Sequence, residues 1–249
     1  MILSSVIYET LLDSVRKDKR GRSISVEEYN SLAPIVNESV FSHYYKEFES
    51  SPESSSKMGD FRVIGESVAI AGGVGTLPVS FYSLSGKPYY TDASGVIRWL
   101  DLVSDMEHAW RQGDYLTQGS LAYPTFRLGT ATVGGAKQIY VTPTAGINPI
   151  VVDYIRVANT PKLDYFISDS TLLYVWGTAG ENMNVPAGST SMSGVAGAAV
   201  VASQTVNWEF DNDDLPLIIS LFMQIMGIQM PDEALWQGGT TLREKEEQP

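Results

Sequence analysis

The stretch that decides the fold is "SISVEEYNSLAPIVNESVFSHYYKEFESS", residues 23–51. Ser25 and Glu28 lie three residues apart near its start, which is the spacing of a capping box that begins an α-helix. Pro34 falls inside the helical pattern and predicts a kink or a division into two helices. One face of the pattern comprises Tyr29, Leu32, Val36, Val40 and Tyr44.

An aromatic cluster lies near the end of this helix. Its members crowd two sides of the helix, which is more than a single core-facing stripe requires. One interpretation packs one side on a β-domain and the other on a neighbouring subunit, and the alternative closes the protein's own core with all of them. The candidate subunit-interface residues are Phe41, Tyr44, Tyr45, Phe48, Phe222 and Trp236, of which the first four form the cluster.

The composition indicates a folded protein that has little affinity for nucleic acid. The chain has 249 residues, of which 43% are hydrophobic and 18% charged, so it holds one large domain or a modest domain with helical attachments. Its net charge of −12 opposes general attraction to a phosphate backbone. The basic run "RKDKRGR", residues 16–22, is the local exception. We interpret it as a turn between helices, with a contact to a phosphate or an acidic partner as the alternative.

The residue types limit the chemistry further. The absence of cysteine excludes disulfides, and the presence of only His43 and His108 excludes a multi-histidine metal site. The basic residues near the N-terminus follow the apolar ones, the reverse of a secretory signal. The longest apolar run, residues 215–230, is too short to span a bilayer. We therefore expect a soluble protein that is made in a cytoplasm and has no membrane partner and no cofactor.

The middle of the chain predicts β-structure. Beyond residue 58 the apolar pattern changes to a period of two, with Gly- and Pro-rich turns between short runs. We predict an α+β, mainly β, fold with a central antiparallel β-sandwich or barrel, N-terminal helices and a C-terminal helix. The predicted parts are an N-terminal helical segment (1–51), a linker (52–58), a β-rich core domain (59–210) with a flexible arm near 177–202, and a C-terminal helix with a charged tail (211–249).

Three further segments carry specific expectations. Residues 4–17 repeat Ile7, Leu11 and Val15 at a spacing of four, which predicts a short amphipathic helix. The stretch "MEHAWRQGDYLTQG", residues 106–119, is interpreted as a connecting loop with at most one helical turn. Pro216 is expected in the first turn of the C-terminal helix, and Gly227 is expected to cap its end.

Two patterns suggest phosphate binding or catalysis, and each has a simpler structural interpretation. The Gly-rich "AGGVGT", residues 71–76, lacks the Lys-Ser/Thr ending of a phosphate loop and reads as a hairpin turn. Glu107 and His108 are adjacent and resemble a base with its orienting partner, but no nucleophile motif accompanies them. We predict that they are solvent-exposed and that the protein is not an enzyme, with no catalytic or cofactor-binding residue.

Two other patterns suggest ligands. The acidic residues Asp211, Asp213 and Asp214 do not follow the ligand order of a calcium loop, and helix capping accounts for two of them, so we predict no metal site. Strand tryptophans are more often core or interface residues than parts of a sugar-binding surface. The tryptophans considered are Trp99, Trp110, Trp176 and Trp208.

Two stretches, residues 122–168 and 206–230, resemble virion structural proteins of crAss-like, short-tailed bacteriophages of Bacteroidetes hosts. The helix "EEYNSLAPIVNESVFSHYYKEFE" and the step "NWEF" into an apolar helix belong to the same resemblance. Residues 177–202 depart from it and look like an insertion. The positions that carry the resemblance are Tyr123-Pro124, Ile139 to Pro143, Val152 to Arg156, Pro161 and Tyr165.

The resemblance implies a head-to-tail connector, a ring protein between portal and tail that forms part of the DNA conduit. Its expected partners are other copies of itself in a dodecameric ring, the portal, neighbouring ring or tail proteins, and genomic DNA that passes without specific binding. The expected location is the virion. The 13 tyrosines and five tryptophans suit such interfaces.

Two alternatives from other classes stay open. A carbohydrate- or receptor-binding module of a phage tail predicts that Trp99, Trp110 or Trp176 is exposed in a groove. A hydrolytic enzyme predicts that Glu107 and His108 face a cleft.

Overall fold

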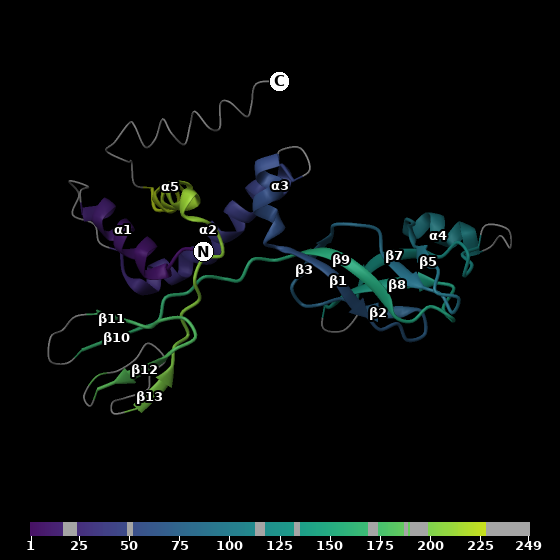
Figure 1. Ribbon diagram of the computed structural model, residues 1–249. Helices are drawn as coiled ribbons and strands as arrows, with labels where there is room; N and C mark the ends of the chain where they lie inside the picture. The colour runs from purple at the N-terminus through teal and green to yellow at the C-terminus, as the bar shows by residue number, and fades with distance from the viewer. Residues whose placement is uncertain are drawn as a thin grey trace, which may run out of the picture. The chain divides into compact units, whose positions relative to one another are not determined.

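The computed structural model describes residues 1–16, 24–48, 52–112, 118–131, 135–168, 174–186, 189 and 199–227. The chain divides into two compact units (Figure 1). Unit 1 combines Met1–Phe48 with Ala158–Pro249, and unit 2 is Glu49–Val157. Unit 2 is thus inserted into unit 1 along the sequence. This division differs from the predicted one, which ran a single β-rich domain over 59–210, because the chain after residue 157 packs with the N-terminal helices.

Unit 1 is built from helices and two short hairpin sheets. The helices are α1 (Ser4–Arg16), α2 (Val26–Lys46) and α5 (Leu215–Ile225), and the 3-10 turn η1 (Asn212–Asp214) precedes α5. The strands β10 (Tyr165–Ile167) and β11 (Tyr174–Trp176) pair antiparallel, as do β12 (Asn182–Val185) and β13 (Ala199–Ala202). The predicted arm near 177–202 therefore contains a hairpin, and Met183 and Val185 of that hairpin are buried with Phe166.

The expected helix starts and ends are confirmed. Ser25 N–H donates to Glu28 Oε2 at 3.0 Å and Glu28 N–H donates to Ser25 Oγ at 3.1 Å, which completes the capping box. Pro216 lies in the first turn of α5, and Gly227 follows that helix with a φ of 66°. The division of the long helix at Pro34 is wrong: α2 is one continuous helix. The fully buried side chains of Ala33 and Val36 hold it on both sides of the proline.

The core of unit 1 gathers around Trp208. Its indole Nε1–H donates to Tyr29 Oη at 2.8 Å, and its backbone pairs with that of Ile2. Phe222 of α5 stacks on Tyr29 with ring centroids 5.3 Å apart and meets Trp208 edge-on at 5.9 Å. Burial raises the pKa of Tyr29 to about 12. These contacts join α2, α5 and the N-terminal residues into one core.

Two asparagines of α2 hold the chain that returns from unit 2. Asn30 Nδ2–H donates to Leu163 O at 2.9 Å, and Leu163 N–H donates to Asn30 Oδ1 at 2.8 Å. Two turns later, Asn37 Nδ2–H donates to Asn159 O at 3.3 Å. The returning chain consequently runs antiparallel to α2, and the long helix binds a later part of its own chain.

Unit 2 contains two helices and nine strands among its described residues. The helices are α3 (Pro52–Gly59) and α4 (Asp105–Gln112). The strands are β1 (Arg62–Val68), β2 (Val74–Thr76), β3 (Phe81–Leu84), β4 (Tyr89–Thr91), β5 (Ile97–Trp99), β6 (Asp101–Leu102), β7 (Thr125–Thr130), β8 (Lys137–Thr142) and β9 (Ile150–Arg156).

Two predicted irregular segments of unit 2 are helical. The expected linker 52–58 lies in α3, which begins at a proline, a residue that fits the first helical turn. The expected loop 106–119 begins with the two-turn helix α4. Ser104 caps α4, since its Oγ accepts the N–H of Glu107 at 3.2 Å, and Glu107 forms an ion pair with Arg111 one turn later. These local contacts stabilise a helix that its composition did not indicate.

The strands of unit 2 form two sheets over one core. One sheet has the order β1-β9-β4-β5, with β3 also paired to β9, and the other has the order β2-β8-β7-β6. The strand pairs of unit 2 are antiparallel except β6 with β7, which is parallel. The α+β fold is confirmed, in the form of two sheets and without closure into a barrel in the described part of the chain. The shared core comprises Val68, Ile70, Leu77, Phe81, Tyr90, Leu100, Phe126, Ile139, Val141, Ile147, Ile150, Val152 and Tyr154.

Among the residues that the structure describes, no helix has the length and apolar character needed to cross a membrane.

The Asn30 contact leads to a prediction about stability. Asn30→Ala leaves the N–H and C=O of the buried Leu163 without partners, so we expect the free energy of unfolding to fall by about 2–4 kcal/mol. Urea unfolding followed by far-ultraviolet circular dichroism measures this, because α1, α2 and α5 supply most of the helical signal.

Ser39→Ala is the matched control on the same helix. It removes only the exposed bond from Ser39 Oγ to Ile35 O, and we expect a change within about 0.5 kcal/mol. Equal losses in the two variants would show that the Asn30 bonds do not hold unit 1 together.

Candidate functional site

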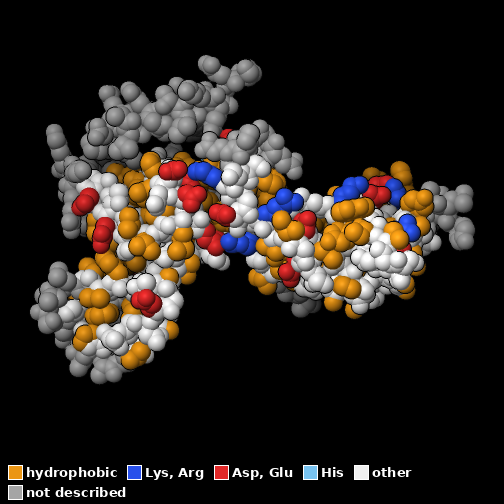
Figure 2. Space-filling model, in the orientation of Figure 1, with side chains coloured by type: hydrophobic (Ala, Val, Ile, Leu, Met, Phe, Trp, Pro, Cys, Tyr) orange, Lys and Arg blue, Asp and Glu red, His pale blue; other side chains and the backbone are white. Residues whose placement is uncertain are grey.

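Unit 2 exposes a run of large apolar side chains along β5, β6 and α4. We call residues 97–110 the apolar segment. Its members Ile97, Trp99, Leu102, Met106 and Trp110 are between 52% and 74% exposed. Figure 2 shows hydrophobic side chains on the visible surface of unit 2, interspersed with Lys and Arg. Large exposed apolar side chains that follow one another so closely in the chain are often part of a contact site.

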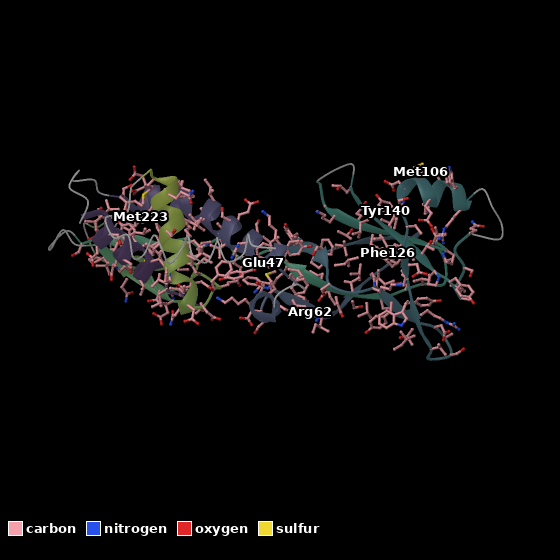
Figure 3. The ribbon with its side chains drawn as sticks, turned by 90° about the horizontal axis from the view of Figure 1, so that it is seen from above. Glu47, Arg62, Met106, Phe126, Tyr140 and Met223 are labelled. Atoms are coloured by element: carbon pink, nitrogen blue, oxygen red, sulfur yellow. The ribbon has the colours of Figure 1, made fainter. Side chains whose placement is uncertain are left out.

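Strand and helix geometry turn these side chains outward. Trp99 is paired with Tyr89 across the strands, with ring centroids 5.0 Å apart, while Tyr90 points into the core on the opposite face. Met106 and Trp110 lie one turn apart and share a face of α4. Figure 3 shows Met106 on the side of α4 that faces away from the strands. The apolar side chains of the segment are therefore exposed because the geometry of β5 and α4 directs them away from the core.

The charges of the apolar segment are neutralised within unit 2. Four charged side chains lie between its apolar members, and each forms an ion pair. Four acidic and four basic side chains take part in these pairs, so the net charge is zero. The pairs are Arg98–Asp92 at 3.2 Å, Lys87–Asp101 at 3.0 Å, Arg127–Asp105 at 2.7 Å and Arg111–Glu107 at 2.6 Å. A partner can cover this surface without supplying an opposite charge.

The net charge of the chain is concentrated in unit 1. Residues 49–157 contain ten acidic and eight basic residues, which leaves unit 2 at −2 out of the total of −12. The remaining −10 belongs to unit 1. Close approach of another protein is thus opposed far less by unit 2 than by unit 1.

Asp92 fixes the turn that leads into β5. Its Oδ1 accepts the N–H groups of Ser94 at 2.9 Å and Val96 at 3.0 Å, and its Oδ2 accepts Arg98 Nε–H at 3.2 Å. Gly95 in the same turn has a φ of 80°, a conformation that favours glycine. The bond from Val96 is the main cause that lowers the pKa of Asp92 below its usual 3.8.

Three of the six predicted interface residues are core residues. Phe41, Tyr44 and Phe222 are buried within the chain, so their assignment to a subunit contact is corrected. Tyr44 Oη–H donates to Asp214 Oδ1 at 2.5 Å, which ties α2 to the start of α5. Tyr45 and Phe48 are half-buried, and their role stays a prediction. Trp236 lies outside the described residues, as does most of the basic run 16–22.

Glu107 and His108, which were predicted to be solvent-exposed, are both half-buried, and their side chains bind different partners. Glu107 binds Arg111, whereas His108 Nε2 lies 3.2 Å from Thr142 Oγ1 beneath α4. His108 lines a small depression to which Glu107 does not contribute. The other residues that line the depression are Arg111, Gln118, Gly119, Thr125 and Thr142.

The acidic residues before α5 act as expected for capping. Asp214 is buried, and its Oδ2 accepts the N–H of Asp211 at 3.0 Å. Asp213 is exposed. In the described part of the chain, no three His, Cys, Asp or Glu side chains come together in a way that could hold a metal ion.

The tryptophans separate by environment. Trp208 is fully buried, Trp99 and Trp110 are exposed in the apolar segment, and Trp176 is half-buried. Trp176 Nε1–H donates to Glu9 Oε1 at 3.1 Å. The sequence offered one signal for the apolar segment, its large apolar residues at spacings of two to four. A core-facing strand and helix give the same spacing, so the sequence did not reveal the exposure.

Comparison with known proteins returned no relative. No protein-family model matches the chain, and no curated protein matches its sequence.

The Asp92 turn predicts a pH dependence. A carboxylate with a lowered folded-state pKa stabilises the fold above its unfolded-state value, and this stabilisation is lost as the pH falls through the folded value. The amide-proton shifts of Ser94 and Val96, measured by NMR, should therefore titrate with a midpoint below 3.8.

Asp92→Ala should abolish this titration and broaden the amide signals of β5, because the turn loses three acceptor bonds. Asp60→Ala, which removes an exposed carboxylate outside the β4–β5 hairpin, should leave the titration of the Ser94 and Val96 amide protons unchanged. A midpoint at or above 3.8 in the unmodified protein would contradict the role assigned to Asp92.

Proposed function

We propose that the protein is a non-enzymatic virion structural protein that forms an oligomeric ring in the head-to-tail connector of a crAss-like, short-tailed bacteriophage. The ring lies between portal and tail and surrounds the path of the DNA. The observation that carries the proposal is the apolar segment, a regular, exposed surface with internally paired charges. The resemblance of residues 122–168 and 206–230 to virion proteins supports the particular class.

The composition of the apolar segment suits a protein–protein contact. Trp, Met and Arg are enriched at interfaces, and the segment contains all three. Covering its five half-exposed apolar side chains contributes on the order of 5 kcal/mol. Association costs about 4–15 kcal/mol, so this surface alone does not hold a stable complex. A ring, in which every subunit contacts two neighbours, supplies the additional contacts.

The distribution of charge suits a DNA conduit. Unit 1 carries −10 of the net charge, and an acidic surface does not release counterions from DNA or bind its phosphates. DNA can pass such a wall without being held. This supports a channel in which DNA is a passing occupant.

The first test is to count copies in the particle. Quantitative mass spectrometry of gradient-purified particles should give about as many copies of this protein as of the portal protein. A large excess over the portal protein would indicate that the protein decorates the capsid or belongs to the tail barrel. Absence from particles would refute the virion proposal.

A pair of variants tests the apolar segment itself. Met106→Lys with Trp110→Lys changes two exposed side chains of α4, so the fold should persist while incorporation into particles falls about tenfold or more. Ile64→Lys on β1 changes another exposed residue of unit 2 and is the matched control. Equal incorporation of both variants would show that the apolar segment takes no part in the assembly contact.

A carbohydrate-binding module is the second candidate, and one observation favours it. Tyr174 and Trp176 lie on one face of β11 with their rings stacked 5.5 Å apart at an interplanar angle of 8°. Tyr165 pairs opposite Trp176 and donates its hydroxyl hydrogen to Glu27, a bond that lowers the pKa of Glu27. Aromatic rings beside ionised carboxylates offer stacking faces and hydroxyl acceptors to a sugar.

Tryptophan fluorescence distinguishes this candidate. A bound glycan should shift the emission of the unmodified protein and of Trp110→Ala, but should leave Trp176→Ala unchanged. The same response in all three proteins, or none in any, would exclude a glycan site at β10–β11.

A further inference from the structure

Strand β5 presents an open edge. It is the terminal strand of the order β1-β9-β4-β5. Hydrogen bonds from Asp92 N–H to Val96 O at 2.9 Å and from Leu100 N–H to Pro88 O at 2.8 Å mark the bonded positions of the β4–β5 pair. By the alternation of an antiparallel ladder, the backbone groups of Ile97 and Trp99 then point away from β4. Within the described residues, neither Ile97 nor Trp99 makes a backbone–backbone hydrogen bond outside the strand ladder.

The opposite edge of the same sheet is protected. Strand β1 has a bulge between Val63 and Glu66 where it pairs with β9. Gly65 in the bulge has a φ of 76°, and its N–H donates to Asp153 Oδ1 at 2.8 Å. Bulges and charged side chains are the devices that prevent a sheet edge from pairing with another chain. The pairing recorded for β5 has no such irregularity, and its one charged residue, Arg98, is bound to Asp92.

We propose that two copies of this chain pair antiparallel through β5, with Arg98 at the centre of the contact. In this register Ile97 of each copy lies opposite Trp99 of the other. Each Ile97 then forms a hydrogen-bonded pair with Trp99 of the other copy. The backbone N–H and C=O groups that point away from β4 thereby gain hydrogen-bond partners in both copies. Pairs of an aromatic and a β-branched side chain are among the favourable cross-strand pairs. The β5 edge is therefore complementary to itself.

The charges around β5 permit this contact. The register brings the two Arg98 residues face to face, and like charges in that position are destabilising when unpaired. Each Arg98 is neutralised by Asp92 of its own chain at 3.2 Å, and unit 2 as a whole is close to neutral. A second copy therefore meets little repulsion at this edge. A contact of this two-fold type closes after two copies, whereas a ring contact continues from copy to copy, so the pairing does not rest on the proposed function. It uses Ile97 and Trp99, at one end of the apolar segment.

The test uses a cysteine placed on the two-fold axis of the full chain. Opposed residues at the non-hydrogen-bonded position of an antiparallel pair have Cα atoms about 4.5 Å apart, which lies within the range of a disulfide. The chain has no cysteine of its own, so Arg98→Cys can link only to its counterpart. Under mild oxidation we expect most of the protein to form a covalent dimer on a non-reducing gel. Ile64→Cys on the protected edge should form no disulfide between copies and should run as a monomer on the same gel.

Sedimentation velocity supplies a second measurement that does not depend on Arg98. The unmodified protein should sediment as a dimer at tens of micromolar, and Ile97→Lys with Trp99→Lys should weaken dimerisation about tenfold or more. Ile64→Lys should leave dimerisation unchanged. A monomeric unmodified protein would overturn the proposal, as would cross-linking of Arg98→Cys no greater than that of Ile64→Cys.

Discussion

The two hydrogen bonds between Asn30 and the backbone of Leu163 are the contact on which the two-unit organisation depends. They join α2 to a segment 133 residues later in the chain. With the Asn37–Asn159 bond they set the returning chain antiparallel to α2. The chain consequently re-enters unit 1 at residues 158–159, beside the C-terminal half of α2. This arrangement lets an entire β-unit be inserted without interrupting the core around Trp208.

The features that were predicted correctly from the sequence are local ones. The Ser25–Glu28 capping box and the start of α5 at Pro216 rest on residues a few positions apart. The unit boundaries rest on the Asn30–Leu163 contact, which has no local signal. Phe222 was assigned to the interface for a related reason: Phe222 and Trp99 are both apolar residues in regular elements, and only the fold shows that the first is buried and the second exposed.

The two units divide the physical properties of the protein. Unit 1 holds most of the negative charge and buries Trp208 and Phe222 in its core. Unit 2 is nearly neutral and turns two tryptophans outward. Electrostatic repulsion between copies therefore comes mainly from unit 1, and short-range attraction comes from unit 2. Contacts made through unit 2 are then less sensitive to salt than contacts made through unit 1.

The insertion of unit 2 sets an order of events during synthesis. Residues 49–157 leave the ribosome before residues 158–227, and unit 2 has its own core, so it can fold first. The apolar faces of α1 and α2 remain uncovered until Trp208 and Phe222 have been made. At about 5–20 residues per second, synthesis of the chain from the end of α2 to Phe222 takes on the order of ten seconds. The first helices of the chain are thus the last part of the protein to acquire a core.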